Sequence, residues 1–218
     1  MLKENFWLCC VLILFFSYFA GLMTVWAAAY FVESRYSCLK NKNERKIIGR
    51  NREIACCFSV LGTIVFLRGE TGEKFFFDSC FICLLCCLTL VDLEVCMIPN
   101  ECVIGIAVLW AVSSFWTGAE GGEALGRITA AMVTVLGVLF VLKQAECFFG
   151  KECLGRGDVK LLGAVTLYLG TEKALPAFFA AFLAGGVYFL IAGIVFQKRK
   201  EAFPLGPFIA VSSFAMLF

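Results

Sequence analysis

Long apolar runs separated by short polar segments are the dominant pattern along this chain. The first run follows Asn5 and holds about 27 apolar or small residues. It is longer than the core of a cleaved secretion signal, and no convincing cleavage site follows it. Because about 20 apolar residues suffice to cross the hydrocarbon of a bilayer, we expect a retained transmembrane helix here.

Seven further apolar runs follow, at residues 54–67, 75–91, 102–117, 125–142, 161–170, 174–196 and 203–218. The runs at 54–67 and 161–170 fall short of the roughly 20 residues that a spanning helix needs. We expect those two to be tilted in a thinned bilayer or partly re-entrant. The pattern therefore predicts an all-α, polytopic membrane helical bundle of about eight transmembrane helices, two of them short or re-entrant.

Composition supports a membrane protein, since 61% of the residues are hydrophobic and only 17% are charged, far from the usual soluble balance. The chain has nineteen basic and seventeen acidic residues, and this near-neutral net charge argues against nucleic acid as a partner. With eight spans and the amino terminus outside, fourteen of the nineteen basic residues fall on one side. That excess predicts that this side is cytoplasmic, and both Asp92 and Asp158 lie at it.

Thirteen cysteines suggest metal or disulfide chemistry until their surroundings are considered. Most lie inside apolar runs, where a thiol behaves as a small hydrophobic group. Cys83 and Cys86 have ligand-like spacing, but no second polar pair accompanies them and a structural zinc site needs four ligands. The odd number of cysteines and the predicted cytoplasmic position of Cys38, Cys147 and Cys153 disfavour a disulfide framework. We expect neither a metal site nor a cofactor.

The chain contains no histidine. This absence excludes a Ser-His or Cys-His nucleophile, an HExxH zinc site and an imidazole proton shuttle within the chain. An enzyme of this composition must therefore work with carboxylates, lysines or cofactors.

Two carboxylates at the ends of apolar runs are the best candidates for chemistry. Asp92 ends one run, and Asp158 begins another within "GRGDVKLLGAVTLYLG", residues 155–170. An ionised carboxylate is costly at membrane depth and usually faces protein or a water-filled cavity. Each one is also compatible with an ordinary charge at a helix end, as is Asp78.

Glycines on either side strengthen the case for Asp158. Gly155 and Gly157 permit positive φ and present no Cβ, so backbone or substrate can approach the carboxylate closely. We expect helix-free backbone beside the acid, able to offer hydrogen bonds to an extended peptide.

Three segments together resemble the type IV prepilin peptidases, bacterial inner-membrane aspartic proteases with a Gly-x-Gly-Asp motif. "GRGDVKLL" is similar to that motif, "VDLEVCMIPN" to the segment in which Asp stands seven residues before Pro, here Asp92 and Pro99, and "FPLGPFIA" (203–210) to the Pro-x-Gly-Pro-Phe segment. The resemblance covers about residues 75–218. It implies that Asp92 and Asp158 are the catalytic pair.

Two carboxylates held close together at low dielectric share a proton and titrate as a coupled pair. One can accept a proton from water while the other donates to the scissile carbonyl and the leaving amine. The two aspartates are 66 positions apart in sequence, so their helices must pack together, with small residues such as Gly163 and Ala164 allowing close approach. Lys160 is expected to mark the cytoplasmic boundary, although it could instead tune the acid or bind a substrate carboxylate.

The resemblance implies a multi-pass protein of the bacterial inner membrane that serves type IV pilus assembly or protein secretion. Its substrate would be a prepilin or pseudopilin, cut between its short basic leader and its hydrophobic helix at the cytoplasmic face. We divide the chain into residues 1–53, an N-terminal transmembrane helix with a basic cytoplasmic loop, and residues 54–218, a transmembrane peptidase core.

One departure from the family concerns methyl transfer. Many prepilin peptidases carry a large cytoplasmic region with two Cys-x-x-Cys pairs, associated with methylating the new amino terminus. The equivalent segment here, 33–53, holds only Cys38, so methyltransferase activity is not expected. An ion- or proton-coupled small membrane transporter and a catalytically silent secretion-assembly protein remain alternative interpretations of buried aspartates.

Overall fold

The computed structural model describes residues 2–36, 72–118, 121–149, 155–196 and 204–217. All regular structure within these ranges is α-helical. The helices are α1 (Leu2–Tyr36), α3 (Gly72–Val95), α4 (Asn100–Trp116), α5 (Gly121–Phe149), α6 (Arg156–Leu169), α7 (Thr171–Phe196) and α8 (Gly206–Leu217). The all-α prediction is thus confirmed for the part of the chain that is described.

Three of these helices are long and apolar enough to cross a membrane, over Lys74–Val95, Gly121–Gln144 and Thr171–Ile191. Helices α4 and α8 are apolar but shorter, with 17 and 12 residues. The chain is therefore a membrane protein, and the total of eight spans stays a prediction. The apolar run at 54–67 and most of the basic loop lie outside the described residues.

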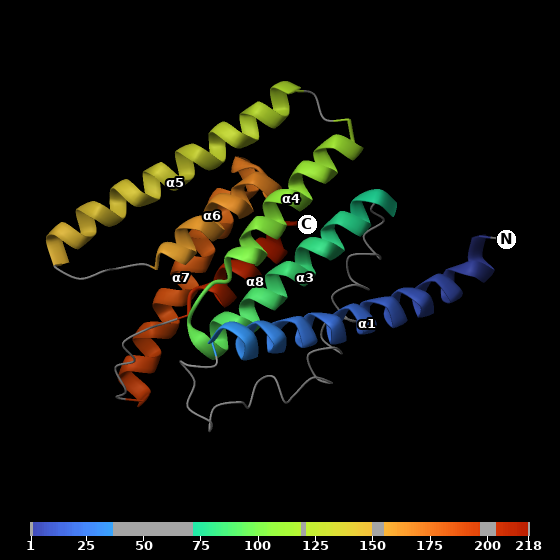
Figure 1. The fold of residues 1–218 in the computed structure, drawn as a ribbon, viewed down its shortest axis with the longest axis horizontal. Helices are drawn as coiled ribbons and strands as arrows, with labels where there is room; N and C mark the ends of the chain where they lie inside the picture. Colours follow the sequence, from blue (N-terminus) through green and yellow to red (C-terminus); the bar gives the residue numbers. More distant parts are fainter. Residues whose placement is uncertain (1, 37–71, 119–120, 150–154, 197–203, 218) are drawn as a thin grey trace. The chain divides into compact units, whose positions relative to one another are not determined.

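The described chain forms two compact units, Met1–Val95 and Cys96–Phe218. Within the first, α1 packs against α3 (Figure 1). Small residues such as Gly21 and Ala28 are buried along α1, and small side chains allow membrane helices to approach closely. At this contact the Thr24 hydroxyl and the Cys83 thiol are hydrogen-bonded.

Helix α6 is the core of the second unit and contacts α4, α5, α7 and α8 (Figure 1). Its 14 residues extend about 21 Å, which is too short to cross hydrocarbon of about 30 Å. Residues 161–166 are all buried, so α6 is surrounded by protein along most of its length. By contrast, α5 exposes long apolar side chains such as Val133 and Phe140 over most of its surface, as a helix in contact with lipid does.

Three hydrogen bonds show which way the helices of this unit run. Arg127 of α5 donates to the backbone oxygen of Tyr168, near the end of α6, at 3.0 Å. Lys173, at the start of α7, donates to the oxygen of Leu217, at the end of α8, at 3.0 Å. Lys160 in the first half of α6 donates to Asn100, the first residue of α4, at 3.2 Å. Helices α4, α6 and α8 therefore begin at one end of the unit, and α5 and α7 begin at the other.

Candidate active site

Asp158 lies in the first turn of α6, three residues after the N-cap residue Gly155. Its backbone N–H donates to the Gly155 oxygen at 3.1 Å, and its carboxylate accepts a hydrogen bond from the Gly155 N–H. This reciprocal pair satisfies one of the N–H groups that a helix start leaves without an intrahelical partner. The side chain is thus held against the N-terminus of α6.

Half-burial raises the pKa of Asp158 from its ordinary value of 3.8 to about 6. The cause is desolvation, which disfavours the charged carboxylate, and the hydrogen bond from Gly155 opposes it. A carboxyl group with this pKa holds or releases a proton near neutral pH. Groups of that kind suit general acid–base catalysis.

Gly155 provides the space that the Asp158 carboxylate occupies. A Cβ built at position 155 would lie 3.0 Å from Oδ2 of Asp158. The backbone of Gly155 is extended, with φ −67° and ψ 140°, so the missing side chain matters here and positive φ does not. The sequence predicted that backbone could approach the carboxylate closely, and the backbone of Gly155 itself does so.

Gly157 is needed for a different contact. A Cβ at this position would lie 3.1 Å from the Cβ of Ile98, in the segment that leads into α4. The sequence predicted helix-free backbone beside the acid. Gly155 is extended, whereas α6 begins at Arg156, so Gly157 and Asp158 are helical. An acidic residue in the first turn favours this helix start.

Pro99 and Asn100 form the start of α4. Pro99 is buried and is the N-cap residue, with φ −66° and ψ 129°. Asn100 accepts the hydrogen bond from Lys160. Sequence reasoning missed Ile98 and Asn100, although both flank Pro99 in the segment that carried the family resemblance.

Asp92 lies in the last turn of α3, in the first unit, and only 4% of its surface is exposed. Asp78, near the other end of α3, is similarly buried at 6%. The two aspartates share one face of the helix with three buried apolar residues at spacings of three and four, Phe81, Leu85 and Leu88. A buried carboxylate within a membrane helix is a candidate for function. Its pairing with Asp158 stays a prediction.

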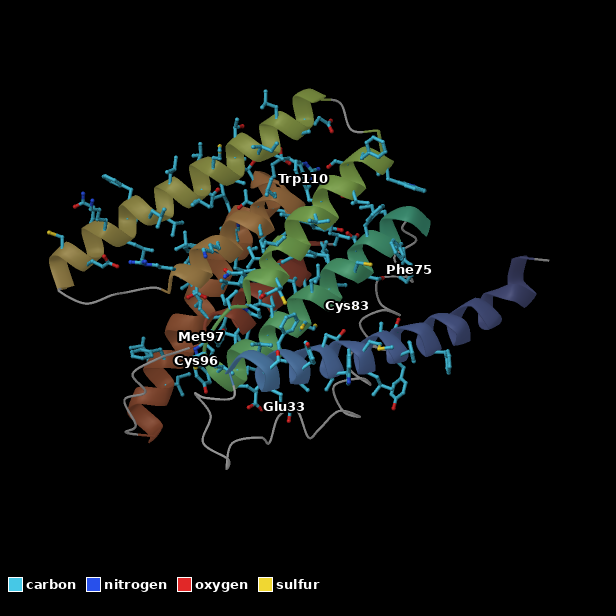
Figure 2. The ribbon with its side chains drawn as sticks, in the orientation of Figure 1. Glu33, Phe75, Cys83, Cys96, Met97 and Trp110 are labelled. Atoms are coloured by element: carbon cyan, nitrogen blue, oxygen red, sulfur yellow. The ribbon has the colours of Figure 1, made fainter. Side chains whose placement is uncertain are left out.

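The helix that carries Asp92 ends in an unusual conformation. Cys96 has φ 53°, the left-handed region that ordinarily favours glycine or asparagine after a helix. Cys96 and Met97 occupy the short segment between α3 and α4 (Figure 2). Both side chains are exposed.

The "PLGP" segment surrounds the start of α8. Pro207 is the second residue of that helix, where the missing N–H costs little, and Leu205 and Gly206 are buried. Among the residues that the structure describes, no group of three or more His, Cys, Asp or Glu side chains could hold a metal ion.

Comparison with known proteins places these segments in context. Residues 79–190 match the model of the type IV leader peptidase family, and this range includes both Asp92 and Asp158. Among solved structures, none gives a significant match to the chain.

Curated relatives carry the name prepilin leader peptidase/N-methyltransferase. The protein from Xanthomonas campestris pv. campestris is 28% identical over 192 residues, covering 85% of this chain and 62% of the relative. The protein from Aeromonas salmonicida is 32% identical over 138 residues, covering 61% of this chain and 45% of the relative. The chain thus spans about half the length of the curated relatives that it matches.

Proposed function

The chain belongs to the type IV leader peptidase family, and on this basis we propose that it is an aspartic endopeptidase that removes the leader from prepilins or pseudopilins. Asp92 and Asp158 act as the catalytic pair. The observation that carries the proposal is the environment of Asp158. This carboxyl group is half-buried, fixed at a helix start and has its pKa raised to about 6.

The reaction needs one ionised and one protonated carboxyl group. Burial raises the pKa of Asp158, so it holds a proton more readily than an ordinary aspartate, and we assign it the role of the acid. The Asp92 carboxylate then removes a proton from water, the water oxygen bonds to the scissile carbonyl carbon, and Asp158 protonates the carbonyl oxygen. When the tetrahedral intermediate collapses, the C–N bond breaks and the amine nitrogen takes up a proton from the pair. No histidine, metal or other cofactor enters this scheme.

We further propose that the pair works at the cytoplasmic face of the bacterial inner membrane, within a multi-pass bundle of about eight helices. The excess of basic residues on that side supports this orientation. In this arrangement a substrate's basic leader stays in the cytoplasm while its hydrophobic helix enters the bilayer. We leave methyl transfer outside the proposal, because the segment 33–53 holds a single cysteine.

A cleavage assay tests the proposal. The protein is purified in detergent and incubated with a prepilin that carries an intact leader, and the cleaved fraction is measured over time. Asp92→Asn and Asp158→Asn should each lower kcat by at least about 100-fold, the scale of general acid–base catalysis. Cleavage by either variant at the wild-type rate would refute the two-aspartate mechanism.

Asp78→Asn is the matched control. Asp78 is about as well buried as Asp92 and lies on the same face of α3, so its replacement removes a similarly buried carboxyl group. We expect this variant to keep kcat within about threefold of wild type. If the wild type leaves every leader attached but drives proton-coupled uptake in liposomes, the transporter interpretation replaces the protease. If it does neither, the silent assembly role replaces it.

A further inference from the structure

Two contacts join the turn that carries Asp158 to the segment that enters α4. The Lys160 ammonium donates to Oδ1 of Asn100 at 3.2 Å. Three residues earlier on α6, Gly157 lies against Ile98, so closely that an added Cβ would be 3.1 Å from the Ile98 Cβ. Both contacts lie within the second unit and involve the same two short stretches, 157–160 and 98–100.

Each of these stretches is held in shape by its own backbone. In the α4 stretch, the proline ring fixes φ of Pro99, and the Pro99 oxygen accepts a hydrogen bond from the Val103 N–H at 3.5 Å. In the α6 stretch, the hydrogen bonds between Gly155 and Asp158 fix the first turn. A contact between two preformed stretches loses less conformational entropy than one between flexible loops.

The α4 stretch is also tied covalently to Asp92. Only six positions separate Asp92 from Ile98. Six residues reach at most about 21 Å when fully extended, and the first of these six are helical, so the true reach is shorter. Any contact that holds residues 98–100 against the Asp158 turn therefore limits how far Asp92 can move from Asp158.

We propose that Lys160 and Asn100 are positioning residues of the proposed peptidase: their hydrogen bond, together with the Gly157–Ile98 contact, keeps the segment that follows Asp92 fastened to the turn that carries Asp158. This inference rests on the proposed function. Lys160 could mark the membrane boundary, tune the acid or bind a substrate carboxylate. The hydrogen bond of its ammonium group to Asn100 favours a positioning role instead. The role is positional, so Lys160 neither protonates the substrate nor binds it.

An exchange of the two residues tests the link kinetically. Lys160→Asn and Asn100→Lys each break the hydrogen bond, whereas the double variant restores a donor and an acceptor with their places exchanged. We expect each single variant to lower kcat three- to tenfold with KM changed less than twofold, the scale of one hydrogen bond. The double variant should recover at least half of the lost rate on a logarithmic scale.

The pH profile separates positioning from electrostatic tuning. A lysine that tuned Asp158 would shift the apparent pKa of the pH–rate profile when it is replaced. If Lys160 only positions the turn, its replacement should leave the apparent pKa within about 0.3 of the wild-type value and lower only the plateau rate. Lys143→Gln is the control, because Lys143 is an exposed lysine near the end of α5, at the same end of the unit. It should leave both values unchanged.

A second measurement does not need catalysis. Cys96 is exposed in the segment just before Ile98, and Cys147 is exposed on α5. The alkylation rate of Cys96 relative to Cys147, followed by peptide mass spectrometry, reports how freely that segment moves. Each single variant should raise this ratio about threefold or more, and the exchange should bring it back toward the wild-type value.

These results distinguish the two proposals. If no prepilin is cleaved but the alkylation ratio rises and is restored by the exchange, the peptidase assignment fails while the link between the two stretches stands. If the wild type cleaves its substrate, and the exchange restores neither kcat nor the ratio, the positioning role is refuted and the peptidase stands. A shifted pH profile with an unchanged ratio would likewise refute positioning and assign Lys160 to tuning.

Discussion

Gly157 packs closely against Ile98: a Cβ at position 157 would be 3.1 Å from the Cβ of Ile98, tighter than most Cβ contacts. Every residue other than glycine at position 98 carries that Cβ, so the contact cannot be relieved by trimming the isoleucine side chain. The backbone of α6 or of the segment before α4 would have to give by a few tenths of an ångström instead. The second glycine of the Gly-x-Gly-Asp motif therefore permits a close packing contact in this protein.

Gly157→Ala should lower the cleavage rate by about tenfold or more, because the shift displaces the turn that carries Asp158. Helix propensity alone favours alanine by about 1 kcal/mol, so a loss would have to come from the contact. Gly137→Ala is the control, since nothing lies within 4 Å of a Cβ at that position in α5. It should leave activity unchanged and raise thermal stability slightly. Equal effects of both substitutions on activity would contradict the prediction.

Gly155→Ala should disturb the acid itself. The backbone angles of Gly155 suit alanine, but the new Cβ would lie 3.0 Å from Oδ2 of Asp158 and would push the carboxylate aside. The hydrogen bond from the Gly155 N–H lowers the pKa of Asp158, so its loss should raise that pKa further above 6. We expect the corresponding limb of the pH–rate profile to move to higher pH. A profile that stays in place, measured beside Gly126→Ala, would rule this out.

Asp158 should also make stability depend on pH in a defined window. Its pKa in the folded protein, about 6, is higher than its ordinary value of 3.8, so the folded state binds more protons between these values. Its contribution to stability is therefore greatest below about pH 4, falls as pH rises toward 6 and stays constant above that. The full loss is on the order of 1–3 kcal/mol.

Asp158→Asn should remove this component. The difference in unfolding temperature between variant and wild type, measured in detergent from pH 4 to pH 7, should change in favour of the variant as pH rises and then level off. The other titrating groups are the same in both proteins, so their contributions to the pH dependence cancel in this difference. A difference that stays constant from pH 4 to pH 7 would mean that burial does not raise the pKa of Asp158.

Gly163 of α6 packs tightly against α5. A Cβ at this position would lie 2.6 Å from Cγ2 of Val135 on α5. Gly163→Ala should therefore destabilise the protein by about 1–3 kcal/mol through overpacking. Val135→Ala removes the obstructing methyl groups, so the double variant should recover most of the loss. A double variant as unstable as the sum of the single variants would show that the contact is not the cause.

The local pattern of the sequence was enough to find most helices. The apolar runs at 75–91, 125–142 and 174–196 correspond to α3, α5 and α7, because helical hydrogen bonds and lipid-facing side chains involve only near neighbours in sequence. The short run at 161–170 corresponds to α6, although α6 starts five residues earlier, at Arg156. That start depends on contacts that the local pattern does not contain.

The sequence by itself determined the chemistry that is possible. Without histidine, a Ser-His or Cys-His nucleophile and an imidazole proton shuttle are excluded, and two aspartates at the ends of apolar runs were the natural candidates. Tertiary structure decided how the residues around Asp158 are used. Lys160 binds Asn100, 60 positions away, Gly157 packs on Ile98, and Gly163 packs on Val135. Such pairings depend on how separate helices meet, and neither spacing nor composition along one segment specifies them.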